Sequence, residues 1–78
     1  MTNLEKYNNA FIEALEITEN ELTGLKYQEI SSWDSIGHMN LIAELEDALE
    51  IEMEADDVIA FSSYEKGKEI VAKYGIVL

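Results

Sequence analysis

The sequence predicts a small all-α fold: a bundle of three main helices and one short helix over residues 55–60, with a long first loop. Apolar residues recur at helical spacing along the chain, and no segment shows the alternation of a half-buried strand. A length of 78 residues suits one domain with a single modest core, so we expect residues 1–78 to form one domain. A hydrophobic content of 47% is too high for a disordered chain.

The first helix begins at Thr2, because Thr2 and Glu5 have the spacing of a capping box. We expect this helix to extend to about residue 15. Its apolar face consists of Leu4, Tyr7, Phe11 and Leu15.

Residues 16–33 have no sustained period and include Gly24, which indicates a long connection. A loop of this length in a small domain is unusual unless it is anchored or functional. Its expected anchors are Leu22, Leu25, Tyr27 and Ile30. We interpret Trp33 as a further anchor against the core rather than as a platform for a bound group.

The second helix has the clearest pattern, and either Ser32 or Asp34 caps it. Its apolar stripe is Ile42, Leu45 and Leu49, with Leu41 and Ala48 beside it. The opposite face carries Ser35, Met39, Ala43 and Asp47. His38 lies at the edge of the stripe, where an imidazole is more often a packed or capping group than a functional one.

The last helix is expected to open with a capping box made by Ser62 and Glu65. Its core-facing residues are Ile70, Val71 and Tyr74. Gly75 followed by Ile76 is typical of a helix C-terminus. Gly67, inside the helix, is expected to destabilise it by about 1 kcal/mol relative to alanine.

The chain is strongly acidic, with 17 Asp and Glu residues against five Lys and a net charge of −12. This sign argues against direct binding to nucleic acid or to anionic membranes and favours partners with basic docking surfaces. Ten of the acids, and no lysine, lie between Tyr27 and Glu65. Such a run is either a solvated face or a docking surface, and its concentration in the second helix and the next loop favours docking.

Composition excludes several kinds of site. The absence of cysteine excludes disulfides, thiol catalysis and Cys-based zinc sites, and one histidine is too few for a His-built metal centre. Residues 47–58 lack the glycine and the closing glutamate of an EF-hand loop, so we expect no dedicated metal site. No apolar run is long enough to insert in a membrane and the N-terminus is unlike a signal peptide, so we expect a cytoplasmic protein.

Ser35 is the residue best placed for chemistry. It follows Asp34 at the start of the second helix, where backbone N–H groups and the helix dipole favour a phosphate. The plain alternative is that Asp and Ser are simply common helix caps. His38 is one turn away, but no third group is evident to orient a Ser–His pair, so we expect neither a hydrolase nor any other enzyme.

Taken together, these features resemble the acyl carrier proteins, a family of phosphopantetheine-binding carriers. The matching residues are Asp34-Ser35-Ile36, Met39, Leu41-Ile42-Ala43-Glu44-Leu45-Glu46, Leu49, Glu52-Met53, Asp56-Asp57 and Ala60-Phe61-Ser62-Ser63. The resemblance covers essentially the whole chain, including its length, its long first loop and its acidic charge. The tripeptide alone is weak evidence, whereas the tripeptide, periodicity, spacing and charge together are specific.

The resemblance implies that the Ser35 hydroxyl is joined through a phosphodiester to 4′-phosphopantetheine, which a phosphopantetheinyl transferase takes from coenzyme A. The thiol of this arm would carry acyl or aminoacyl groups as thioesters between loading and acceptor enzymes, in fatty acid or specialised metabolite biosynthesis. The chain would be a monomeric phosphoprotein, and Asp34 would be the cap and acidic contact beside the cofactor. The implied partner-binding residues are Ile36, Met39, Ala43, Glu46 and Asp47.

Two positions depart from the carriers of fatty acid synthesis. Gly37 stands where an acidic residue is usual, and Glu54 stands where a proline is frequent. The string from Trp33 to His38 is more similar to stand-alone carriers of specialised pathways, or to peptidyl-type carriers, so the cargo is left open. The alternative hypothesis is an unmodified acidic helical module that docks on a basic partner surface. The two differ at Ser35, since Ser35→Ala abolishes carrier function and is nearly silent in the module.

Overall fold

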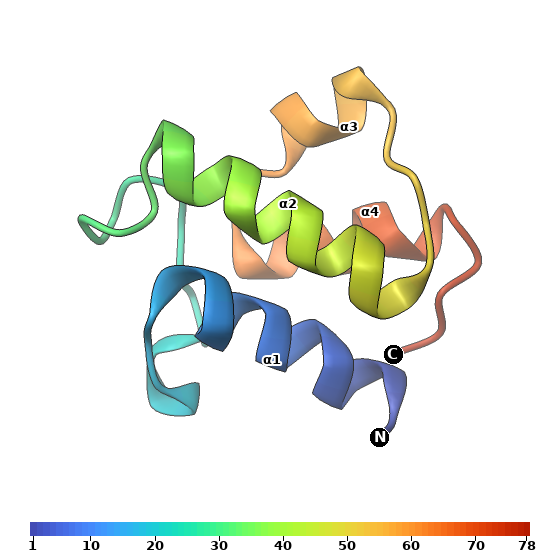
Figure 1. The fold of residues 1–78 in the computed structure, drawn as a ribbon, viewed down its shortest axis with the longest axis horizontal. Helices are drawn as coiled ribbons and strands as arrows, with labels where there is room; N and C mark the ends of the chain where they lie inside the picture. Colours follow the sequence, from blue (N-terminus) through green and yellow to red (C-terminus); the bar gives the residue numbers. More distant parts are fainter.

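The computed structural model describes all 78 residues and contains four α-helices and no strand. The elements in chain order are α1 (Asn3–Leu15), the short 3₁₀ helix η1 (Glu19–Glu21), α2 (Ser35–Leu49), α3 (Ala55–Ala60) and α4 (Tyr64–Ala72). α1 and α2 lie side by side and run in opposite directions; α3 lies on the side of α2 away from α1, and α4 lies behind α2 in this view (Figure 1). The predicted all-α class, with three main helices and one short helix, is confirmed. None of the helices has the length and apolar content that a membrane span requires.

The start of α1 is the predicted capping box. Thr2 Oγ1 accepts a hydrogen bond from the Glu5 backbone N–H at 3.1 Å, and Glu5 Oε1 accepts one from the Thr2 N–H at 2.9 Å. Tyr7 and the later residues of the predicted apolar face are buried, and Ala10 lies with them. Leu4, the first residue of that face, is 38% exposed, because the packed core begins one turn later, at Tyr7.

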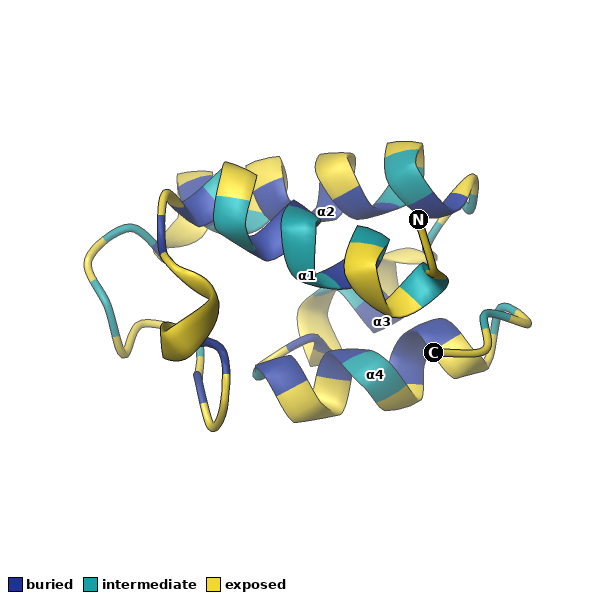
Figure 2. Ribbon diagram, turned by 90° about the horizontal axis from the view of Figure 1, so that it is seen from below, coloured by how far each residue is buried: buried dark blue, intermediate teal, exposed yellow.

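The centre of the core is aromatic. The ring of Phe11 lies 5.1 Å from that of Tyr7, 5.3 Å from Tyr64, 5.5 Å from Trp33 and 5.9 Å from Phe61, measured between ring centroids. All five side chains are buried, and the buried positions of α1, α2 and α4 face one another across this cluster (Figure 2). Close-packed rings of this kind leave little free volume inside the bundle.

The long first loop is anchored both by side chains and by its backbone. Leu22, Leu25 and Trp33 are buried, as predicted, whereas Tyr27 and Ile30 are half-buried. The Tyr27 N–H donates to the carbonyl of residue 62, and the N–H of residue 64 donates to the Leu25 carbonyl, both at 2.9 Å. These two bonds form a short antiparallel bridge that fastens the loop to the start of α4.

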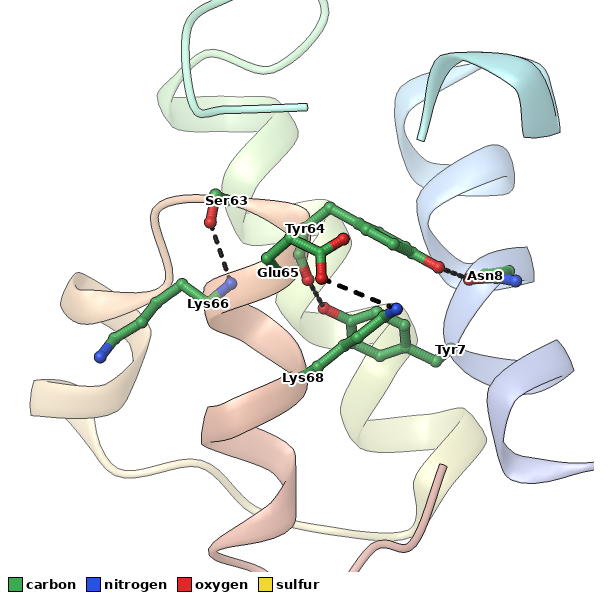
Figure 3. A network of polar contacts seen from close by, with 7 residues as sticks. All are labelled: Tyr7, Asn8, Ser63, Tyr64, Glu65, Lys66 and Lys68. Carbon is green, nitrogen blue, oxygen red and sulfur yellow. Dashed lines mark hydrogen bonds and ion pairs between the residues drawn. The ribbon is translucent and has the colours of Figure 1, made fainter. Parts of the chain in front are cut away.

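The same bridge corrects the predicted start of α4. It holds Ser63 in an extended conformation, so the helix begins at Tyr64 and its N-cap is Ser63 rather than Ser62. Ser63 Oγ accepts a hydrogen bond from the Lys66 N–H at 2.9 Å (Figure 3). The predicted capping box with Glu65 therefore does not form.

A chain of polar contacts joins α4 to α1 (Figure 3). The Tyr7 hydroxyl donates to the Tyr64 carbonyl at 2.6 Å, and the Tyr64 hydroxyl donates to Asn8 Oδ1 at 2.5 Å. Lys68 Nζ lies 4.6 Å from the centre of the Tyr64 ring, and 3.9 Å from Glu65 Oε1. Burial raises the pKa of Tyr7 above its ordinary value, so this phenol stays protonated and keeps its donor role.

Gly67 is a packing requirement rather than a weak point of α4. A Cβ at this position would lie 2.2 Å from Cζ of Phe61 and 2.3 Å from the Tyr7 hydroxyl oxygen. The sequence-based expectation concerned helix propensity alone; the structure adds that the missing side chain lets these two rings reach α4.

The end of α4 is tied to α3 by a second polar cluster. Lys73 Nζ lies 2.5 Å from Asp57 Oδ1, the Tyr74 hydroxyl donates to Asp57 Oδ2, and the Glu54 N–H donates to the Tyr74 hydroxyl at 2.9 Å. The hydrogen bonds from Lys73 and Tyr74 lower the pKa of Asp57 below its ordinary value. Although no lysine lies within the acidic interval of the sequence, Lys73 from beyond it supplies a counter-charge to Asp57.

Candidate functional site

At the N-terminus of α2, Asp34 caps the helix and the hydroxyl of the next residue, Ser35, is not used as a cap. Asp34 is the N-cap: its Oδ1 accepts a hydrogen bond from the Gly37 N–H at 2.8 Å, and its carbonyl accepts one from the His38 N–H at 2.8 Å. Ser35 is the first residue inside the helix, its side chain is exposed, and its hydroxyl makes no hydrogen bond within the protein. Of the two caps that the sequence allowed, Asp34 is the one used.

Two backbone donors stand next to the Ser35 hydroxyl. The N–H groups of Ser35 and Ile36 have no hydrogen-bond partner within the protein. The Asp34 side chain accepts from the Gly37 N–H and its carbonyl accepts from the His38 N–H. Free N–H groups and the positive end of the helix dipole suit an anionic group. The residues present therefore fit a phosphodiester attached at Ser35.

The sequence places His38 one turn from Ser35 without a third group to orient a Ser–His pair. The Trp33 indole N–H donates to His38 Nδ1 at 3.0 Å, and His38 Nε2 lies 2.8 Å from the Val58 carbonyl oxygen. Both ring nitrogens are thus engaged away from the Ser35 hydroxyl. The site contains no Ser–His pair that could act as a nucleophile and its base.

Gly37 has a steric reason to be glycine. A Cβ at this position would lie 1.9 Å from the carbonyl oxygen of Ser32, because the incoming loop crosses the first turn of α2 at close range. Glycine at this position is therefore a packing feature of the loop that precedes Asp34.

A cleft of about 380 Å³ opens beside Ser35, between α2, α3 and the loop that precedes α4. Its exposed rim consists of Ser35, Met39, Ile59 and Ser62. Its floor consists of the less exposed residues Tyr27, His38, Val58 and Phe61. The cleft is mainly apolar, and Ser35 is one of the residues that line it.

Two large apolar side chains that line this cleft, Met39 and Ile59, face solvent, and so does Ile36, next to Ser35 in the sequence. Ile36 is 74% exposed, Met39 is 58% exposed and Ile59 is 81% exposed. The first two are predicted partner contacts, whereas Ile59 of α3 was missed. The helical pattern of a six-residue element is too short to tell its outer face from its inner one. Only the packing of α3 beside α2 brings Ile59 to the site.

Of the remaining predicted partner-binding residues on α2, two are exposed and one is held by a hydrogen bond within the protein. Ala43 and Asp47 are exposed and continue the face that carries Ser35. Glu46 is half-buried, and its Oε2 accepts a hydrogen bond from the Met53 backbone N–H at 2.9 Å. Of the two predicted acidic contacts, Asp47 is free for a partner, while Glu46 also holds the loop after α2.

Comparisons with protein-family models, with curated proteins and with solved structures find no match to this chain. Its function is therefore inferred from the residues around Ser35.

Proposed function

We propose that this chain is a cytoplasmic carrier protein whose Ser35 bears 4′-phosphopantetheine. The observation that carries the proposal is the division of roles at the start of α2, where Asp34 makes the cap and the Ser35 hydroxyl is exposed and unbonded. A serine that served only as a cap would place its hydroxyl on a backbone N–H of the first turn.

Attachment would be a phosphoryl transfer to the Ser35 hydroxyl. Ser35 Oγ forms a bond to the phosphorus nearest the pantetheine half of coenzyme A, the hydroxyl proton is lost, and the adenosine bisphosphate half leaves. The base has to come from a phosphopantetheinyl transferase, because both nitrogens of His38 are already hydrogen-bonded. The group supplies the thiol that this cysteine-free chain lacks, which can hold acyl or aminoacyl groups as thioesters.

The protein's own residues would hold the phosphodiester loosely and present it to enzymes. The free N–H groups of Ser35 and Ile36 lie beside the attachment point, and no Lys lies near it in the sequence. Exposed apolar side chains at Ile36, Met39 and Ile59 offer a small contact surface around it. Free acids such as Asp47 would steer partners with basic surfaces, setting encounter rate and salt dependence more than affinity.

Intact-mass measurement tests this proposal. The purified chain is incubated with coenzyme A, Mg²⁺ and a broad-specificity phosphopantetheinyl transferase, beside Ser35→Ala and Ser62→Ala variants. Ser62 is the matched control, because it is an exposed serine on the rim of the same cleft. We expect one phosphopantetheinyl group on the wild type and on Ser62→Ala, and none on Ser35→Ala.

The contrary result is an unmodified wild type in a reaction that fully modifies a known carrier. Together with an unmodified protein from its native cell, that result would favour the acidic module that docks without a cofactor. In that case Ser35→Ala would leave partner binding unchanged.

A further inference from the structure

His38 joins three segments around the floor of the cleft. An indole N–H can only donate, so His38 Nδ1, 3.0 Å from Trp33 Nε1, must be the acceptor of that bond. The ring proton therefore sits on Nε2, which donates to the Val58 carbonyl oxygen at 2.8 Å. One neutral imidazole thus connects the long loop, α2 and α3.

Aromatic rings fill the space behind this imidazole. Trp33 stacks on His38 with an interplanar angle of 18°, and Tyr27 and Phe61 contact the imidazole at centroid distances of 5.3 and 6.1 Å. Trp33 and Phe61 are almost completely buried and both contact Phe11 in the centre of the core. An alkyl chain could pass this layer only by breaking the hydrogen bonds of His38 and displacing close-packed rings.

No other hollow continues the cleft into the bundle. The second lies along the C-terminal residues 68–78, and the third lies on the surface of α1 and η1, between residues 5 and 19. The cleft beside Ser35 therefore ends at its floor.

We infer that His38 closes the inner end of this cleft and limits the groups that can be sheltered beside Ser35 to short ones. For the cargo, this inference rests on the proposed function: the carrier holds short or polar acyl groups, and a long alkyl chain stays outside the core. The closure by His38 is a property of the fold and does not depend on modification of Ser35.

A chemical series attached at Ser35 tests the closure. Because the chain has no cysteine, Ser35→Cys introduces a single thiol. Its thiolate attacks the sulfenyl sulfur of an alkyl methanethiosulfonate, so that a disulfide forms and methanesulfinate leaves. Methyl, butyl, octyl and dodecyl adducts are compared by their thermal midpoint and by the NMR signal and exchange protection of the Trp33 indole N–H.

We expect the midpoint to rise from methyl to butyl and then to rise no further, because only the first carbons reach apolar surface in the cleft. The Trp33 indole signal should keep its position and protection in every adduct. A midpoint that climbs through dodecyl, with a displaced and unprotected indole N–H, would show entry into the core and overturn the inference.

Two further variants in the Ser35→Cys background separate closure from general packing. His38→Ala removes the hydrogen bonds to Trp33 and to the Val58 carbonyl. In this variant we expect the thermal midpoint to keep rising up to the octyl adduct, and the NMR signal of the Trp33 indole N–H to shift. Met39→Ala shortens a neighbouring side chain on the rim of the same cleft and should keep the butyl limit. If the thermal midpoint of His38→Ala also stopped rising at the butyl adduct, His38 would not be the residue that closes the cleft. If His38→Ala does not fold, the adducts with His38 intact decide the question by themselves.

This experiment separates the inference from the carrier proposal, since no transferase is used. A butyl limit without phosphopantetheinylation of Ser35 would overturn the carrier function and keep the closure. Phosphopantetheinylation of Ser35 with free entry of the dodecyl chain would keep the carrier function and overturn the closure.

Discussion

At the scale of single residues, several side chains have roles that only their three-dimensional neighbours define. Gly67 permits the approach of Phe61 and of the Tyr7 hydroxyl, and Asp57 is a buried acid held by Lys73. Helix propensity predicts that alanine at position 67 stabilises the protein, whereas the packing around Gly67 predicts the opposite. Charge counting predicts that Asp57 adds only repulsion, whereas its contact with Lys73 predicts a stabilising role. Two substitutions make this difference measurable.

Gly67→Ala should destabilise the protein, although alanine is the better helix former. The new Cβ would lie 2.2 Å from a Phe61 ring atom, and overpacking of this kind costs about 1–3 kcal/mol. Urea unfolding measures the change, and Glu69→Ala, at an exposed position of the same helix, should alter the free energy of unfolding only slightly. A more stable Gly67→Ala protein would contradict the packing assignment.

Asp57 should make the protein sensitive to acid. Hydrogen bonds from Lys73 and Tyr74 lower the folded-state pKa of Asp57 below its ordinary value of 3.8. The ionised carboxylate therefore contributes stability above that ordinary pKa, and the contribution is lost as the pH falls through the lowered folded-state pKa. Asp57→Asn should be less stable than the wild type at neutral pH.

The difference in unfolding free energy between wild type and Asp57→Asn, from urea titrations at neutral pH and at pH values stepped down below 3.8, measures this term. We expect the difference to shrink on acidification. A difference that is the same at every pH would show that ionised Asp57 does not stabilise the fold.

At the scale of elements, α1 and α2 both end on a residue that glycine would suit better. Glu16 and Glu50 occupy the left-handed region with φ of 55°, where the backbone of a residue with a side chain is strained.

The helix periods and caps predicted most of the element bounds, because those signals are local. Ser63 as the cap of α4 could not be predicted, since Ser62 is an equally good cap and the choice is made by the bridge to Lys26 in a distant loop.

Glu50→Gly should stabilise the protein by about 1 kcal/mol, because it relieves the left-handed backbone conformation at the end of α2. Glu50→Ala removes the same charge but keeps a Cβ at positive φ, so it is the matched control. The thermal midpoints of the two variants are compared at equal salt. Equal stabilisation by both substitutions would assign the effect to charge instead of backbone strain.

At the scale of the whole molecule, the sequence predicted the bundle and most of the residues around Ser35, because the face of α2 follows from its period. The depth of the cleft could not be predicted. It depends on His38, whose two partners come from the loop and from α3, and on Ile59, whose orientation is set by packing. Long-range contacts of this kind leave no periodic signal in the sequence.

The net charge of −12 should make the stability of the whole fold depend on salt. Only Asp57 and Glu65 form ion pairs with lysines, so most of the acids repel one another without a bound counter-charge. The thermal midpoint should rise by several degrees between very low and physiological NaCl, as screening weakens this repulsion. A midpoint that does not move with salt would show that the acids are too far apart to destabilise the fold.

The central claim is that Ser35 carries phosphopantetheine in the cell. The most direct test is the intact mass of the protein isolated from its native cell, followed by fragmentation of the peptide that contains Ser35. We expect one phosphopantetheinyl group, free or acylated, on Ser35. A protein of unmodified mass, isolated under conditions that preserve phosphodiesters, would contradict this claim.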